Sequence, residues 1–199
     1  YNSLAITIGQ QGKLDEAIQL FNKAILLKPN YSEAYFNIGI IFKRKNRLNE
    51  ALNSYQTAIN LKPNYAECFY NIATIFQEQG KLNDAIDYYD KALIKRPDYH
   101  KALAQKLYQK AKICDWKTIH KDKKLFSKIG TSKNYIPPFT MLFFEDDPRN
   151  HYLRSKLYAK KKYLQKQIPF EKKQKVFKKK RIRIGYFSAD LQNHATMYL

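Results

Sequence analysis

One repeat period dominates the first half of this sequence. Pro29, Pro63 and Pro97 are spaced by 34 residues, and several alanine, aromatic and leucine positions recur at the same step. The recurring positions are Ala17, Ala51 and Ala85; Ala24, Ala58 and Ala92; Phe21, Tyr55 and Tyr89; and Leu14, Leu48 and Leu82. Such a period indicates stacked units, each exposing an apolar face that only its neighbour can cover.

Each unit has the pattern of two helices joined by a turn. Residues 32–45 and 48–61 carry apolar side chains at helical spacing. Asn46 falls between them, where the chain needs a residue that tolerates a left-handed backbone, and Gly12 and Gly80 are its equivalents in the neighbouring units. Pro63 ends the second helix because proline lacks the N–H donor and clashes with the preceding turn.

Composition excludes several classes of protein. Of the 199 residues 44% are hydrophobic and 27% are charged, which is ordinary for a globular protein and excludes a mainly disordered chain. Two cysteines cannot make a disulfide scaffold or a four-cysteine zinc site, so we expect no metal centre. The apolar stretch at residues 135–144 is about half the roughly 20 residues that a membrane helix needs, so we expect no membrane span.

Positive charge is concentrated in the second half. Residues 1–99 hold 12 basic and 10 acidic side chains, whereas residues 100–199 hold 25 and 7. The basic residues cluster at 160–162 and 172–183, which is consistent with a solvated linker, a nucleic-acid or membrane-surface contact, or a nuclear-import-like patch. No aromatic RNA-stacking motif lies beside this run, so nucleic acid is not the expected partner.

Further elements are predicted after the repeats. Residues 100–113 form a helix that covers the last repeat through Ala102, Leu103 and Leu107, and residues 117–129 form a second helix. The inward side chains of that second helix are Ile119, Leu125, Phe126 and Ile129. Asp147-Pro148 is a helix start, with the helix continuing to about Lys166. Residues 181–188 alternate apolar and polar side chains, which predicts a β-strand.

Asparagine occupies one equivalent position on the first helix of successive units. Asn37 and Asn71 share this position, and Ser3 holds it in the first unit. An asparagine amide can both donate to and accept from the backbone of an extended peptide. The alternative is that these amides stay solvated or bond a neighbouring helix.

His194 is the strongest candidate for chemistry. It follows the predicted strand, and ligands in open α/β sheets bind at such strand ends. Its imidazole could accept a proton or bond a sugar hydroxyl, with Asp190 orienting it. The alternative is a structural or solvated histidine. His100, His120 and His151 have no ligand spacing.

Residues 1–99 resemble the tetratricopeptide repeat, with its helix-turn-helix unit, small residue, alanine, aromatic, alanine and proline. In this frame the repeats are 1–31 (partial), 32–65 and 66–99, followed by a capping helix at 100–113. Tyr1 falls at the fourth position of its unit, so we expect a fragment of a longer protein.

Nearly the whole chain resembles the O-linked N-acetylglucosamine transferase family and its SPINDLY-type and bacterial relatives. The resemblance rests on the repeats, on Cys114-Asp115-Trp116, on Asp146-Asp147-Pro148 and above all on the run from Ile184 to Thr196. It implies a mainly α fold: a repeat solenoid, a helical linker region at 114–180, and at 181–199 the first β-strand of a truncated Rossmann-like (GT-B) lobe.

That resemblance also implies a function. The repeats would bind an acceptor protein, and the catalytic domain would transfer N-acetylglucosamine from UDP-GlcNAc to Ser or Thr without a metal or other cofactor. His194 matches the active-site histidine of the family, and Asn37 and Asn71 match its peptide-binding asparagines. Residues 194–198 lack the second histidine of the animal enzymes, which leaves the donor sugar open. The donor contacts would lie beyond residue 199, so this chain alone is expected to be inactive. The location expected for the protein is the cytoplasm, or the nucleus if the organism is a eukaryote.

Two other classes of function compete with this prediction. A non-catalytic tetratricopeptide scaffold that binds proteins would need only residues 1–113, and the predicted strand with His194 argues against it. A nucleic-acid binder would use the basic second half and would show steep salt dependence.

Overall fold

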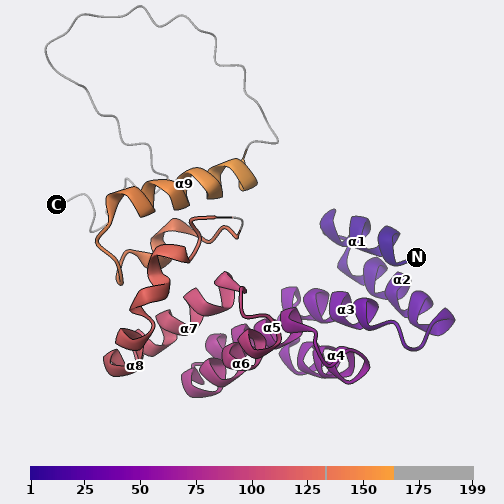
Figure 1. The fold of residues 1–199 in the computed structure, drawn as a ribbon. Coiled ribbons are helices and arrows are strands. Elements are labelled where there is room, and N and C mark those ends of the chain that lie inside the picture. The colour runs from indigo at the N-terminus through magenta and orange to yellow at the C-terminus, as the bar shows by residue number, and fades with distance from the viewer. Residues whose placement is uncertain (133, 164–199) are drawn as a thin grey trace, which may run out of the picture. The chain divides into compact units, whose positions relative to one another are not determined.

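The described part of the chain is helical throughout. The computed structural model describes residues 1–132 and 134–163, and no β-strand occurs among them (Figure 1). The repeat region contains α1 (Asn2–Gln10), α2 (Leu14–Leu27), α3 (Ser32–Arg44), α4 (Leu48–Leu61), α5 (Ala66–Glu78) and α6 (Leu82–Lys95). After it come α7 (His100–Lys112), α8 (Trp116–Lys121), two 3₁₀ helices, η1 (Lys123–Lys128) and η2 (Pro138–Met141), and α9 (Pro148–Lys162).

Helices α1–α6 pack as three successive pairs, α1 with α2, α3 with α4, and α5 with α6 (Figure 1). The turn within each pair contains a residue of positive φ, 89° at Gly12, 57° at Asn46 and 75° at Gly80. Asparagine and glycine are the residues that tolerate this left-handed conformation best. The predicted helix pairs and their turns are therefore confirmed.

Small and aromatic side chains set the packing between the helices. A Cβ atom on Gly39 would lie 2.5 Å from Cε1 of Tyr55, so only glycine allows this approach of α3 to α4. The aromatic contacts recur with the repeat: Phe36 packs on Tyr55 and Tyr65 with ring centroids 5.9 and 4.9 Å apart. One unit later Tyr70 packs on Tyr89 and Tyr99 at 5.6 and 5.2 Å. These tilted pairs bury large apolar area between consecutive elements.

Helix α7 covers the apolar face of α6. Ala102, Leu103 and Leu107, the residues predicted to face inward, are all buried. Leu107 joins a second apolar cluster with Ile129 and Met141, so α7 connects the repeats to the helices that follow them.

The single helix predicted at residues 117–129 is instead α8 followed by η1. Residues 121–124 read Lys-Asp-Lys-Lys, so Ile119 has no apolar partner one turn later to hold the α-helix together. Ile119 and Phe126 are buried as predicted, but Leu125 is exposed.

Asp147 caps α9 as predicted, because its carboxylate accepts hydrogen bonds from the backbone N–H groups of Arg149 and Asn150. The helix ends at Lys162, before the predicted end near Lys166.

A buried arginine holds α9 against η1. Arg154 is fully buried, and its guanidinium donates to the carbonyl oxygens of Ile129 and Phe126 at 2.8 and 2.7 Å. It also forms an ion pair with Glu145 at 2.5 Å. A buried guanidinium is tolerated only when its donors are satisfied, so these contacts fix the position of α9.

The structure shows a mainly helical, tetratricopeptide-like solenoid with further helices after it. The predicted strand at 181–188 and the loop that follows it lie outside the described residues, so a Rossmann-like lobe is not shown. None of the helices described is both long enough and apolar enough to cross a membrane.

Candidate functional site

The first helices of consecutive repeats, α1, α3 and α5, lie next to one another and form a shared surface, here called the first-helix face. Lys43 on α3 donates to Thr74 Oγ1 on α5 at 2.7 Å and pairs with Glu78 at 2.9 Å. Arg44 donates to the carbonyl oxygen of Gly9 at 2.8 Å. These contacts between successive repeats fix the spacing of the side chains along the face.

Both predicted asparagines lie on this face and are partly buried. Asn37 Nδ2 donates to Asn2 Oδ1 on α1 at 3.3 Å, and Asn71 Nδ2 donates to the carbonyl oxygen of Glu67, on its own helix, at 2.8 Å. Each amide thus uses one of its two N–H donors within the protein. Within residues 1–132 and 134–163, no hydrogen bond reaches Oδ1 of either side chain. The amides therefore keep one donor and one acceptor that a peptide backbone could use.

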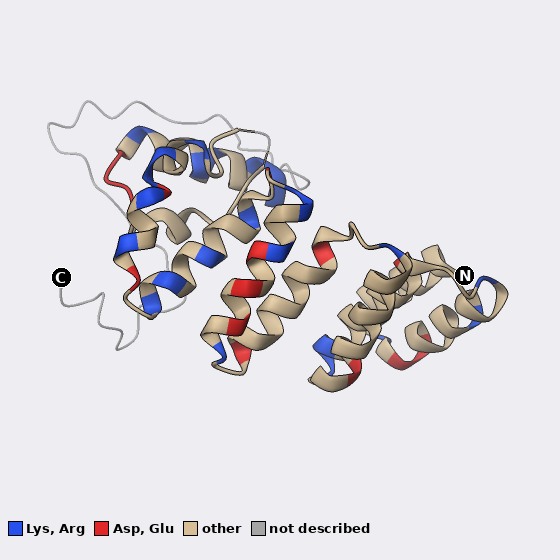
Figure 2. Cartoon of the chain, turned by 60° about the horizontal axis from the view of Figure 1, so that its bottom comes forward, with Lys and Arg blue, Asp and Glu red and all other residues tan. Residues whose placement is uncertain are grey.

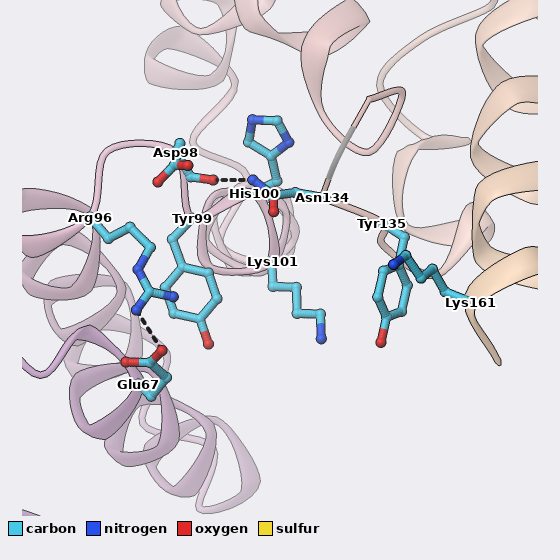
Figure 3. A pocket seen from close by; sticks show the side chains of 9 residues that line it. All are labelled: Glu67, Arg96, Asp98, Tyr99, His100, Lys101, Asn134, Tyr135 and Lys161. Atoms are coloured by element: carbon cyan, nitrogen blue, oxygen red, sulfur yellow. Dashed lines mark hydrogen bonds and ion pairs between the residues drawn. The ribbon is translucent and has the colours of Figure 1, made fainter.

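A pocket of about 630 Å³ opens beside the last repeat (Figure 3). Its lining comes from α5, the loop before α7, the start of α7, residues 134–135 and the end of α9. The lining residues are Glu67, Arg96, Asp98, Tyr99, His100, Lys101, Asn134, Tyr135 and Lys161. Arg96 pairs with Glu67 at 2.5 Å and lies over the Tyr99 ring, 4.9 Å from its centroid, so this carboxylate is already neutralised.

A second pocket of about 330 Å³ shares Lys101 and Tyr135 with the first. Its lining includes Tyr70 and Gln105 from α5 and α7, together with residues 135–137, Thr140, Tyr158 and Lys162. Gln105 occupies, on α7, the position that Asn37 and Asn71 occupy in the repeats. The two pockets therefore lie at the α7 end of the row of amide side chains.

Two tyrosines of these pockets, Tyr70 and Tyr99, stay neutral. Burial raises the pKa of both Tyr70 and Tyr99 above the ordinary range. Their hydroxyl groups are therefore hydrogen-bond donors and acceptors at any physiological pH rather than charged groups. Burial likewise raises the pKa of Cys68 to about 12, so this thiol in the repeat core is protonated and inert.

The predicted catalytic pair, His194 and Asp190, lies outside the described residues. Among the residues that the structure does describe, no group of three or more His, Cys, Asp or Glu side chains is placed to hold a metal ion.

Sequence reasoning missed Lys101, Tyr135 and Lys162. Extending the 34-residue frame to α7 would have placed Lys101 and Gln105 on the first-helix face. No sequence signal brings Tyr135 and Lys162 to the same place, since both come from elements outside the repeats.

Comparison with known families agrees with the geometry. Residues 10–46 and 41–80 match a family model described as TPR repeat, and residues 66–99 match the tetratricopeptide repeat. The chain therefore contains tetratricopeptide (TPR) repeats.

Two solved structures share this fold. "Crystal structure of MamA" is 24% identical, with a TM-score of 0.52 over 55% of this chain and 64% of that chain. "MamA RS-1 ArsTM double mutant" is 20% identical, with a TM-score of 0.52 over 59% and 66%. This chain thus spans slightly less than two thirds of each structure. No curated protein sequence is similar enough to count as a match.

Proposed function

We propose that this chain is a protein-interaction module that binds an extended segment of a partner protein against the first-helix face. The observation that carries the proposal is the row of equivalent amide side chains, Asn37 and Asn71, on adjacent first helices of TPR repeats. Each keeps hydrogen-bonding capacity, and successive repeats space these groups along a line. A peptide backbone presents donors and acceptors at regular intervals, so a row of amides can bind it whatever its side chains are.

The test replaces both asparagines. The variant N37A/N71A is expected to bind a panel of extended synthetic peptides about 5–150-fold more weakly, since two hydrogen bonds of about 0.5–1.5 kcal/mol each are lost. The loss should be similar for every peptide that binds, because the contacts are with the peptide backbone. Fluorescence anisotropy with labelled peptides gives the affinities.

The matched control is N53A/N83A, which removes two exposed asparagines from the second helices α4 and α6. Its affinities should equal those of the unmodified chain. Thermal unfolding followed by circular dichroism verifies that all variants are folded. Equal binding by N37A/N71A and the control would refute the role of the asparagines, and binding of none of the peptides by the unmodified chain would refute the proposed function.

Transfer of N-acetylglucosamine from UDP-GlcNAc to Ser or Thr is a second proposal. It is supported by the sequence run from Ile184 to Thr196, in which His194 would act as the active-site imidazole and Asp190 would orient it. A gene product that continues beyond Leu199 should transfer labelled sugar to an acceptor peptide and lose this activity in the variant H194A. Unchanged transfer by H194A would reject that role.

A further inference from the structure

Three lysines lie around the two pockets at the α7 end of the first-helix face. Lys101 lines both pockets, Lys161 the larger one and Lys162 the smaller one. In Figure 3 the Lys101 side chain extends into the opening between Tyr99 and Tyr135. We propose that this lysine cluster binds an acidic side chain of the partner peptide, so that the module selects peptides carrying Glu or Asp. The inference rests on the proposed peptide-binding function.

The charges around the pockets are unbalanced. Two carboxylates, Glu67 and Asp98, face four cationic side chains, Arg96 and the three lysines. Glu67 is already paired with Arg96. For none of the three lysines does a carboxylate of residues 1–132 or 134–163 come within 4.0 Å. An anionic group from a ligand would complete this arrangement.

Aromatic side chains hold two of the ammonium groups in place. Lys101 Nζ lies 4.8 Å from the centroid of the Tyr135 ring, and Lys162 Nζ donates to the Tyr158 hydroxyl at 2.8 Å. The rings of Tyr135 and Tyr158 are themselves 6.0 Å apart. The hydrogen bond to Tyr158 raises the pKa of Lys162, which keeps this ammonium charged. Positioned cations lose less side-chain entropy when they bind a carboxylate than freely rotating ones.

The rest of the face argues for an acidic peptide rather than a nucleic acid. Positive charge collects in the helices after the repeats (Figure 2). Along the first-helix face itself, Lys43 is paired with Glu78 at 2.9 Å, and Lys62 is paired with Glu33 at 3.3 Å. These two lysines are already neutralised, so a continuous phosphate backbone would gain little from them along the face, whereas a peptide with one acidic segment can place it at the lysine cluster alone.

The test compares two labelled peptides that differ only in charge. Both are short, extended sequences of Ser, Thr and Val, one with a central Glu-Glu pair and the other with Gln-Gln. We expect the Glu-Glu peptide to bind the unmodified chain at least about 10-fold more tightly, as charge-assisted hydrogen bonds contribute about 1.5–3 kcal/mol. The variant K101Q/K162Q should lose this preference while still binding the Gln-Gln peptide as well as the unmodified chain does.

The control variant K124Q/K160Q removes the same charge from exposed lysines of η1 and α9 that line neither pocket. It should keep the preference. The conservative variant K101R/K162R should keep most of it, because both charges remain.

Several outcomes would overturn the inference: equal affinities for the two peptides, an equal loss in the control variant, or a single-stranded oligonucleotide that binds more tightly through the same two lysines. If peptides bind through the asparagines but without regard to charge, the proposed function stands and only the acidic preference falls.

Discussion

Replacing Arg154 is expected to make the region after the repeats unfold at a much lower urea concentration than the repeats themselves. The variant R154M introduces an unbranched apolar side chain. It removes the donors to two carbonyl oxygens and the ion pair with Glu145, whose side chain is only 13% exposed. Breaking a buried ion pair on one side costs about 3–5 kcal/mol, since the remaining carboxylate stays buried without its partner. With a urea m-value of about 1–3 kcal/mol/M, the midpoint should fall by roughly 1–5 M.

The chain offers a built-in probe for this experiment. Its single tryptophan, Trp116, begins α8, so its fluorescence reports on the region after the repeats. Far-UV circular dichroism reports mainly on the helices of the repeats. The two urea transitions should separate in R154M, with fluorescence changing first. The double variant R154M/E145L should recover part of the loss, because it removes the stranded carboxylate.

Arg149 supplies the matched control, since it is exposed on the same helix. The variant R149M should leave both transitions where they are. A fluorescence midpoint that moves no more in R154M than in R149M would show that the buried guanidinium does not stabilise this region, and the reasoning above would be wrong.

Two further predictions concern buried polar groups. The side chain of Gln109 is fully buried, and neither of its amide atoms has a hydrogen-bond partner among the described residues, so Q109I should raise the free energy of unfolding by about 1–3 kcal/mol in urea titrations. No change, or a loss, would mean that this amide is satisfied. The hydroxyl of Tyr55 also lacks a partner within the described residues, whereas that of Tyr89 donates to Gln77 at 2.9 Å. Thermal unfolding should therefore show Y55F neutral or stabilised and Y89F destabilised by about 0.5–1.5 kcal/mol, and the opposite order would contradict the assignment.

The repeat frame itself supports these substitutions. The positions equivalent to Gln109 are Ile41 and Ile75, both buried, and the position equivalent to Tyr55 is Phe21 in the first repeat. The chain thus already contains the apolar side chains that the predictions introduce, in the corresponding environments of its own neighbouring repeats.

The sequence predicted the repeats closely because their constraints are local. The helix pairs, the left-handed turn at Asn46 and the burial of the alanines all follow from contacts within one unit or between adjacent units. The same reasoning gave a wrong single helix at 117–129, where four consecutive charged residues leave the middle of the segment without apolar contacts.

The candidate site was only half predictable. Asn37 and Asn71 were found from their equivalent positions, but the sequence could not show which of their donors the protein itself uses. The sequence did not single out the lysine cluster, because its members belong to a second half that is rich in lysine and arginine throughout. The prediction of a glycosyltransferase depends on His194 and Asp190 and stays a prediction.

By itself the sequence determined a stack of helix pairs, since a 34-residue period of small and aromatic residues can bury its apolar faces only by stacking. Only the tertiary structure decided that pockets form beside the last repeat, and which residues line them. Lys101 comes from α7, Tyr135 from the segment before η2 and Lys162 from the end of α9, and the buried Arg154 fixes α9 against η1. Contacts between residues so far apart in the chain depend on how separate elements pack, and no local pattern records them.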